Sequence, residues 1–194
     1  MNISARMIIV LTVVCLFSGL SLVFVNQCSK PQIEKNAVDT TQKAVYKVLP
    51  NVKNIEKVVS GETVIFKGFD KDGEHIGYAF VAEGNGYQGN IKIMVGISPE
   101  LEKLIGIEIL ESVETPGLGA KITEDEFKCQ FKGVSVSPEI AYVKGKEPEK
   151  PNEIETITGA TISSKSVVKI LNTSIEKVKE ILKGKENRGE AKDE

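Results

Sequence analysis

The segment from Met7 to Val25 constrains this chain most, because it contains no charged side chain. As an α-helix it is expected to be about 28 Å long, close to the thickness of the hydrocarbon core of a bilayer. A secretory signal peptide is the competing interpretation, but this run is longer than a usual signal core and no A-x-A-like cleavage site follows it. A lipoprotein signal needs small residues before Cys28, where Asn26 and Gln27 stand. We therefore expect residues 1–29 to form an uncleaved, single-pass membrane anchor.

The charges beside this anchor do not decide which side of the membrane the rest of the chain faces. Arg6 and the amino terminus precede the apolar run, which favours an amino terminus inside the cell. Lys30, Lys35 and Lys43 follow the run and weaken that preference. On charge alone, both orientations stay open.

The remaining sequence excludes some classes of function. The chain is 41% hydrophobic and 27% charged, with a net charge of −2, and its lysines are interleaved with acids rather than gathered into a basic patch. Binding to nucleic acid is therefore not expected. Cys15, Cys28 and Cys129 are too far apart for a zinc or iron–sulfur motif, and His75 is the single histidine, so no metal site is predicted. Cys28 and Cys129 could pair outside the cytoplasm.

The apolar spacing along the chain predicts an α+β domain with flanking helices. Residues 30–52 are expected to form a juxtamembrane amphipathic helix that Pro50 ends, and residues 53–183 a single domain. Four strands joined by short links predict an antiparallel sheet, at 62–70, 74–83, 90–97 and 103–112. The expected later elements are a short helix over 123–131 with a Thr123/Glu126 capping box, a strand over 139–145, a polar loop over 146–155 and a final amphipathic helix. Residues 184–194 are expected to be a charged, disordered tail.

Two stretches interrupt this regular pattern. In "ETPGLGAKI", Glu114–Ile122, Pro116 fixes φ while Gly117 and Gly119 permit positive φ. In "ETITGATISSKSVVKIL", which starts at Glu155, small and hydroxylated residues lead straight into the final helix. The free N–H groups at a helix start bind phosphate, yet Ser and Thr are also common N-caps. A phosphate site and a simple helix cap therefore both remain open, and the lysine of a Walker A motif is absent.

The sequence resembles the FMN-binding domain family in three stretches. "TGAT", Thr158–Thr161, is similar to the family's [ST]GAT flavinylation motif. "ETPGLGAKI" and "GYQGNIKIMVGI" resemble its ETPGLG loop and the strand after its GYxG turn, in the same order along the chain. The family includes the G subunit of the Rnf ion-translocating electron-transport complex and the C subunit of the sodium-pumping NADH:quinone oxidoreductase. The resemblance extends from Met7 to about Lys183, and the short chain favours the G subunit of Rnf.

The resemblance implies FMN joined through its phosphate to the hydroxyl of Thr161, attached by a separate flavin transferase that uses FAD. Glu155 stands where the family usually has an aspartate, and the histidine common before the ETPGLG loop is replaced by Ser112 and Val113. We expect Leu118 to pack on the flavin ring and Lys121 to stabilise reduced, anionic flavin. The full set of expected cofactor-binding residues is Thr161, Thr158, Gly159, Ala160, Glu155, Glu114, Thr115, Gly117, Leu118, Gly119 and Lys121.

The implied function is that of a membrane-anchored electron carrier, one redox subunit of an Rnf-type complex that couples ferredoxin and NAD chemistry to sodium or proton transport. The expected partners are the other membrane subunits, which must hold the ion path because one helix without internal charge cannot. The family places the domain on the extracytoplasmic side of the prokaryotic plasma membrane. The alternatives are a stand-alone extracytoplasmic FMN electron-transfer protein, the C subunit of a sodium-pumping NADH:quinone oxidoreductase, or a sensor or binding domain without covalent cofactor.

Overall fold

The first helix connects two compact units. The computed structural model describes residues 3–60 and 63–189. Helix α1, Ile3–Val48, runs through the boundary between a unit that ends at Thr40 and a unit that begins at Thr41. Among the described residues, α1 is the one helix long and apolar enough to cross a membrane, and its apolar stretch is exposed. The predicted boundary at 52/53 differs from this division, because the last turns of α1 belong to the packed domain.

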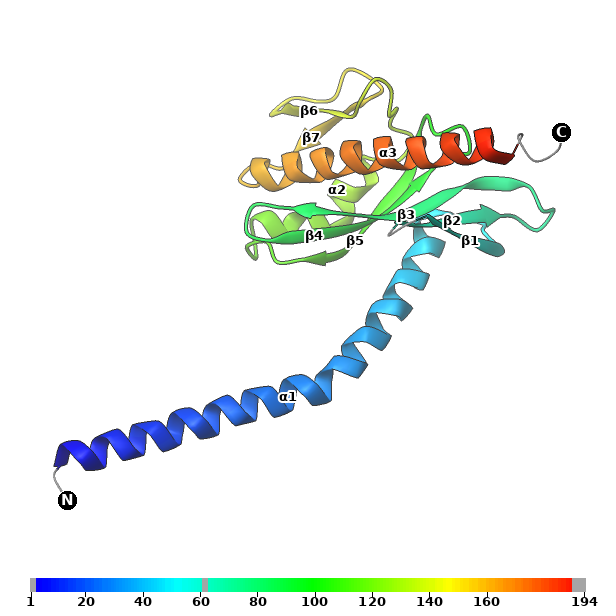
Figure 1. Ribbon diagram of the computed structural model, residues 1–194. Helices are drawn as coiled ribbons and strands as arrows, with labels where there is room; N and C mark the ends of the chain where they lie inside the picture. Colours follow the sequence, from blue (N-terminus) through cyan, green and yellow to red (C-terminus); the bar gives the residue numbers. More distant parts are fainter. Residues whose placement is uncertain (1–2, 61–62, 190–194) are drawn as a thin grey trace. The chain divides into compact units, whose positions relative to one another are not determined.

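A five-stranded antiparallel sheet forms the centre of the second unit, within the described residues (Figure 1). Its order is β1-β2-β3-β4-β5, with bounds Asn54–Ser60, Thr63–Phe69, His75–Asn85, Asn90–Ile97 and Leu104–Ser112. The predicted antiparallel sheet is confirmed, and the four predicted strands correspond to β2 through β5. Strand β1 was not predicted: its sequence NIEKVVS has only a short apolar part, and its stability comes from pairing along the whole of β2.

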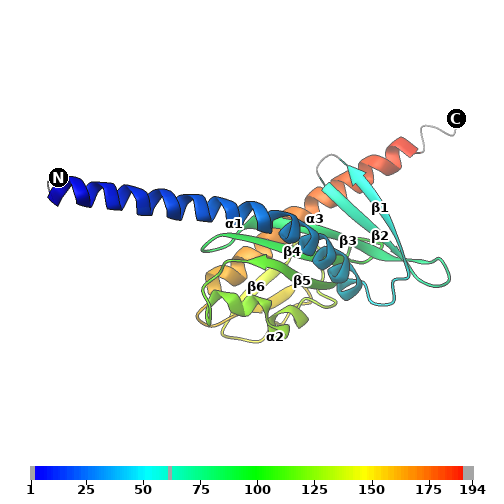
Figure 2. The ribbon, with the colours of Figure 1, turned by 90° about the horizontal axis from the view of Figure 1, so that it is seen from below.

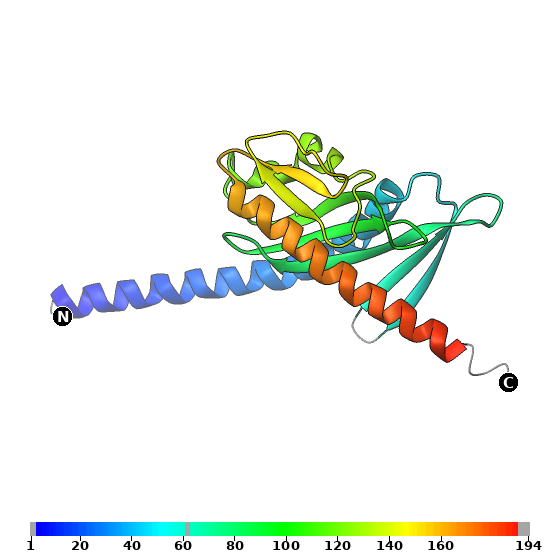
Figure 3. The same ribbon diagram turned by 90° about the horizontal axis from the view of Figure 1, so that it is seen from above.

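The two faces of the sheet carry different layers, because neighbouring side chains on a strand point to opposite faces. On one face, Phe80 and Ala82 of β3 join a core with helix α3, Thr161–Gly189, which crosses the sheet (Figures 1 and 3). On the other face, Ala79 packs with the last turns of α1. The buried residues of α1 are Ala44, Val45 and Val48, followed by Leu49. The apolar face predicted for the 30–52 helix comprised Ala37 or Val38, Thr41, Val45 and Val48/Leu49; Val45, Val48 and Leu49 are buried, whereas Val38 is exposed.

Smaller elements connect the sheet to α3. They are the 3-10 helix η1, Gly119–Thr123, helix α2, Asp125–Cys129, and the strands β6, Ala141–Lys144, and β7, Glu153–Thr156. The predicted capping box is wrong: Glu124 is the N-cap of α2 without a side-chain bond, and the Thr123 hydroxyl donates to the Ala120 carbonyl. Strand β7 lies in the predicted loop, because its parallel pairing with β6 is a tertiary contact that the local pattern does not show.

Helix α3 begins at Thr161 and continues to Gly189. The apolar stripe predicted for this helix is buried, at Val167, Val168, Leu171, Ile175 and Val178. The helix also runs past residue 183 into the segment predicted as a disordered tail, and residues 190–194 of that tail lie outside the described residues.

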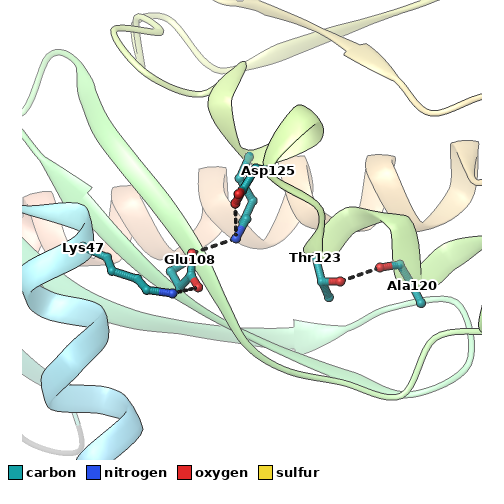
Figure 4. A network of polar contacts seen from close by, with 6 residues as sticks. Lys47, Glu108, Ala120, Thr123 and Asp125 are labelled. Carbon is teal, nitrogen blue, oxygen red and sulfur yellow. Dashed lines mark hydrogen bonds and ion pairs between the residues drawn. The ribbon is translucent and has the colours of Figure 1, made fainter.

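Figure 2 shows the last turns of α1 lying over the sheet, and an ion-pair network joins them to β5 and α2 (Figure 4). The carboxylate of Glu108 accepts hydrogen bonds from Lys47 Nζ at 2.6 Å and Lys128 Nζ at 2.9 Å, and Lys128 also pairs with Asp125 at 2.9 Å. Burial raises the pKa of the Glu108 carboxyl, but the hydrogen bonds from Lys47 and Lys128 lower it more, so the pKa lies below its ordinary value of 4.5. The folded state therefore favours the ionised form of this group.

Replacing Glu108 with glutamine is expected to lower the free energy of unfolding at pH 7 by about 1–2 kcal/mol, because the largely buried Lys128 loses one of its two charged partners and keeps only the exposed Asp125. The stability that Glu108 contributes is present above pH 4.5 and is lost as the pH falls through its lower folded pKa. Acidification should therefore reduce the difference in the free energy of unfolding between the wild type and Glu108→Gln. Urea unfolding at pH 7 and below pH 4 measures this.

Glu111→Gln provides the matched control, because Glu111 lies on the same strand in an exposed pair with Lys92 at 3.0 Å. Such surface pairs contribute about 0–1 kcal/mol. If Glu108→Gln and Glu111→Gln lost the same free energy of unfolding at pH 7, the Glu108 network would contribute no more than an exposed ion pair.

Candidate functional site

Three stretches that are distant in sequence meet at the carboxylate of Glu114. Its Oε1 atom accepts hydrogen bonds from the backbone N–H of Tyr87 at 2.6 Å and of Gln88 at 3.1 Å. Its Oε2 atom accepts one from the Ser163 hydroxyl at 2.7 Å. The β3–β4 turn, the loop after β5 and the first turn of α3 are thereby joined, and we call this set of three bonds the Glu114 clamp. Glu114 is buried, with 5% of its surface exposed.

Two glycines make room for this buried carboxylate. A β-carbon on Gly86 would lie 2.3 Å from Glu114 Oε1, and one on Gly119 would lie 2.6 Å from Oε2 and 2.7 Å from Ser163 Oγ. Real β-carbons do not approach so closely, so any larger residue must displace the clamp. The prediction of positive φ is correct for Gly117, at 75°, but wrong for Gly119, which lies in η1 and is required for close packing instead.

The loop after β5 brings Leu118 to the start of α3. The Thr115 carbonyl accepts hydrogen bonds from the N–H groups of Leu118 and Ala120, which makes the loop compact. The Leu118 side chain is 51% exposed, and its Cδ2 atom lies 3.5 Å from where Gly159 would carry a β-carbon. Gly159 itself has a φ of 86°, in the left-handed region that favours glycine. The "ETPGLG" and "TGAT" stretches are therefore neighbours.

The backbone N–H groups at the start of α3 have no acceptor in the described part of the chain. The first helical bond of α3 runs from Ser164 N to the Ala160 carbonyl. The N–H groups of Thr161, Ile162 and Ser163 precede that bond and carry the partial positive charge of a helix start. Ala160 is buried and small, so the backbone of this turn can be approached closely.

The four hydroxyl side chains between residues 158 and 164 differ in their hydrogen bonds and exposure. Ser164 donates to the Ala160 carbonyl at 3.0 Å and accepts from Ile157 N at 3.1 Å, and Ser163 is bound to Glu114. In the part of the chain that the structure describes, no hydrogen bond engages the side chain of Thr161, which is partly exposed, or that of Thr158, which is exposed. Thr161 is thus an accessible hydroxyl on the first residue of a helix.

A polar cavity of about 300 Å³ lies beside this helix start. Glu155 of β7 faces it, and the amide of Gln130 fixes the Glu155 backbone through bonds of 2.8 and 3.4 Å. Thr156, next in the chain, has a buried hydroxyl that finds no hydrogen-bond partner among the described residues. The lining residues are Lys121, Glu124, Glu126, Phe127, Gln130, Glu155, Thr156, Ile157 and Thr158.

The structure therefore brings the predicted site residues together in two groups. Lys121, Glu155 and Thr158 line the cavity, whereas Leu118 and Gly159 meet at the helix start. Glu114 lies beneath the surface as a connector, with both oxygens already bonded. Sequence reasoning missed Gln130 and the Tyr87–Gln88 amides, because a glutamine side chain and two backbone donors leave no motif.

Comparison with known proteins assigns a family to these features. A model of the FMN-binding domain matches residues 86–176, which include the Glu114 clamp and the "TGAT" stretch. The G subunit of the sodium-translocating ferredoxin:NAD⁺ oxidoreductase complex of Acetobacterium woodii is 34% identical over 187 residues, covering 87% of this chain and 88% of that protein. The G subunit of the proton-translocating ferredoxin:NAD⁺ oxidoreductase complex of Clostridium ljungdahlii is 33% identical over 175 residues, covering 90% of this chain and 91% of that protein.

A solved structure shares the fold. The C subunit of the sodium-translocating NADH-quinone reductase of Parabacteroides distasonis superimposes with a TM-score of 0.61 at 24% identity, covering 74% of this chain and 91% of that chain. At this identity the likeness concerns the fold alone.

Proposed function

Because the chain belongs to the family formed by the G subunits of ion-translocating ferredoxin:NAD⁺ oxidoreductase complexes, we propose that it is a membrane-anchored flavoprotein that carries electrons within such a complex. The matching FMN-binding domain supports FMN as its cofactor. The relatives' names specify sodium in one case and protons in the other, and the proposal covers both ions. The other membrane subunits hold the ion path, because α1 has no charge in its apolar run.

Thr161 is the attachment site in this proposal, and the free hydroxyl at the first residue of α3 is the observation that supports it. A phosphoryl group on Thr161 Oγ1 would be close to the N–H groups of the first turn, which stabilise negative charge. Gly159 and Ala160 leave the approach open. The neighbouring Ser163 and Ser164 are poor acceptors of FMN because both are buried and hydrogen-bonded within the protein.

The attachment reaction is a phosphoryl transfer from FAD. The bond from Thr161 Oγ1 to the phosphorus atom of the FMN half forms, the pyrophosphate P–O bond breaks, and AMP leaves. The hydroxyl proton passes to a base on the flavin transferase, since a threonine hydroxyl is a weak nucleophile without one. Bound FMN supplies the redox chemistry, while the protein supplies position and electrostatics.

The residues around Thr161 have proposed roles toward the flavin. Leu118, exposed beside Gly159, offers an apolar surface to the ring, and Thr115 with the backbone of Gly117–Gly119 offers hydrogen-bonding groups. Lys121, exposed at the cavity, offers a positive charge to the reduced ring. Glu155 keeps a carboxylate at the entrance to the motif.

The decisive test is the intact mass of the full-length chain produced with and without an FAD-dependent flavin transferase. The proposal expects a gain of FMN minus water only with the transferase, and a fluorescent band in a denaturing gel. It also expects the flavin to be reduced by ferredoxin in membranes that contain the other subunits. An unmodified chain in the presence of active transferase would favour a sensor or binding domain without covalent cofactor.

The proposed position of the domain outside the cytoplasm leads to a labelling prediction. Cys129 is free and exposed, so a membrane-impermeant maleimide should label it in intact cells of a Cys15→Ser, Cys28→Ser variant. Labelling is read by the mass shift of the purified protein. A further Cys129→Ser variant is the control, and labelling that requires broken cells would place the domain in the cytoplasm.

A further inference from the structure

We propose that Glu114 and Ser163 act as a positioning pair, which holds the first turn of α3 so that the Thr161 hydroxyl is presented for modification. The inference depends on the proposed attachment of FMN to Thr161. Neither residue touches the transferred group in this role, because both are buried while Thr161 is partly exposed. They act through the helix backbone.

The first turn of a helix needs an external bond to be rigid. The N–H groups of Thr161, Ile162 and Ser163 precede the first helical hydrogen bond, so within α3 the backbone of this turn is held through its carbonyl groups alone. Ends of this kind open easily. Ser163 lies within the turn, two positions after Thr161, and its 2.7 Å bond to Glu114 connects the turn to another part of the domain.

Glu114 is itself fixed to the turn between β3 and β4. Its Oε1 atom accepts the two backbone bonds from Tyr87 and Gln88, in the turn that joins β3 to β4. That turn is closed by a bond of 2.7 Å from Gly86 N to the Gly89 carbonyl. The clamp therefore transmits the rigidity of two central strands to the turn that carries Thr161.

Loss of the Ser163 hydroxyl should slow modification without preventing recognition. Ser163→Ala removes the bond to Glu114 and leaves Oε2 unpaired, so the turn samples orientations in which Thr161 does not react. The exposed side chains of Thr158 and Ile162 are unchanged, so the transferase should bind the variant as before. We expect kcat for flavin attachment to fall about tenfold, with KM for the protein substrate unchanged within twofold.

Glu114→Gln is the conservative partner variant. The carboxamide oxygen can still accept from Tyr87 and Gln88, and its NH₂ group can donate to Ser163 Oγ, so the connection is kept with donor and acceptor exchanged. This variant is expected to react within about threefold of the wild-type rate. Ser166→Ala is the matched control on α3, since no hydrogen bond engages the Ser166 side chain among the described residues.

The experiment follows intact mass over time for the full-length chain in detergent, with purified flavin transferase and FAD. If the flavin-bearing fraction of Ser163→Ala rises slowly but reaches the wild-type plateau, the positioning pair is supported. A full plateau shows that every molecule is folded and reactive, so the slow rate comes from the presentation of Thr161. A wild-type rate for Ser163→Ala overturns it, whether the plateau is full or reduced, since a reduced plateau at that rate means that the pair only maintains the fold.

Two further outcomes are decisive. If Glu114→Gln is as slow as Ser163→Ala, the charge of Glu114 rather than the connection matters, and the inference is wrong. If the wild-type chain gains no flavin, or gains it at another residue, the proposed attachment site has failed and the positioning role falls with it.

Discussion

Replacing Thr161 with alanine is expected to abolish covalent attachment of FMN completely. The substitution removes the one oxygen that forms the phosphoester and leaves the surroundings of the helix start in place. Alanine is also the best helix former, so α3 should begin as before. Intact mass after production with the flavin transferase measures the result, together with flavin fluorescence in a denaturing gel.

Thr173→Ala serves as the control for this experiment, because Thr173 is an exposed threonine on the same helix and lies three turns away from the motif. It should gain the full mass of the wild type. A Thr161→Ala chain that still carries covalent flavin would show that the attachment site lies elsewhere, with Thr158 as the next accessible hydroxyl to map.

Replacing Phe131 with alanine should produce the largest loss of stability, about 3–5 kcal/mol in the free energy of unfolding. Phe131 is fully buried in the main core, and its ring packs edge-to-face on Phe127 of α2, with the ring centroids 5.3 Å apart. The variant leaves a cavity where α2 meets the sheet. Urea unfolding of the full-length chain in detergent, followed by circular dichroism, gives the value.

Phe131→Leu is the graded control, because leucine keeps most of the apolar volume and should cost less than about 1.5 kcal/mol. Equal losses for the two variants would contradict the packing described for this ring. Since α2 also borders the cavity beside Thr158, the unstable alanine variant should accept flavin only as far as it remains folded.

The regular elements were predictable where their stability comes from a local pattern. The apolar stripe of α3 follows from burying one face of a helix, and the apolar runs of β2 through β5 follow from a sheet that is packed on both faces, so the local pattern identifies both. Strand β1 and strand β7 were missed for a common reason. Each has a short, mixed sequence, and each is stabilised by a partner strand, β2 or β6, whose position the local pattern does not contain.

The candidate site also combines features that the local sequence shows with features that depend on distant partners. The motif around Thr161 was recognisable because a hydroxyl, two small residues and a helix start must be consecutive in the chain. The role of Glu114 could not be recognised from the sequence, because its hydrogen-bond partners lie at residues 87, 88 and 163, far from it in the chain. Gly119 shows the difference within one loop: its sequence suggests backbone freedom, whereas its neighbours Glu114 and Ser163 demand the absence of a side chain.

The sequence by itself determined the apolar segment long enough to span a membrane, the α+β class and the hydroxyl-rich entrance to the last helix. These depend on length, spacing and residue type, which are properties of neighbouring positions. Only the tertiary structure decided which hydroxyls are free. Ser164 is bonded to neighbours in its own stretch, whereas Ser163 is bonded to the buried carboxylate of Glu114, which reaches α3 only when the sheet has folded, and Thr161 is left accessible.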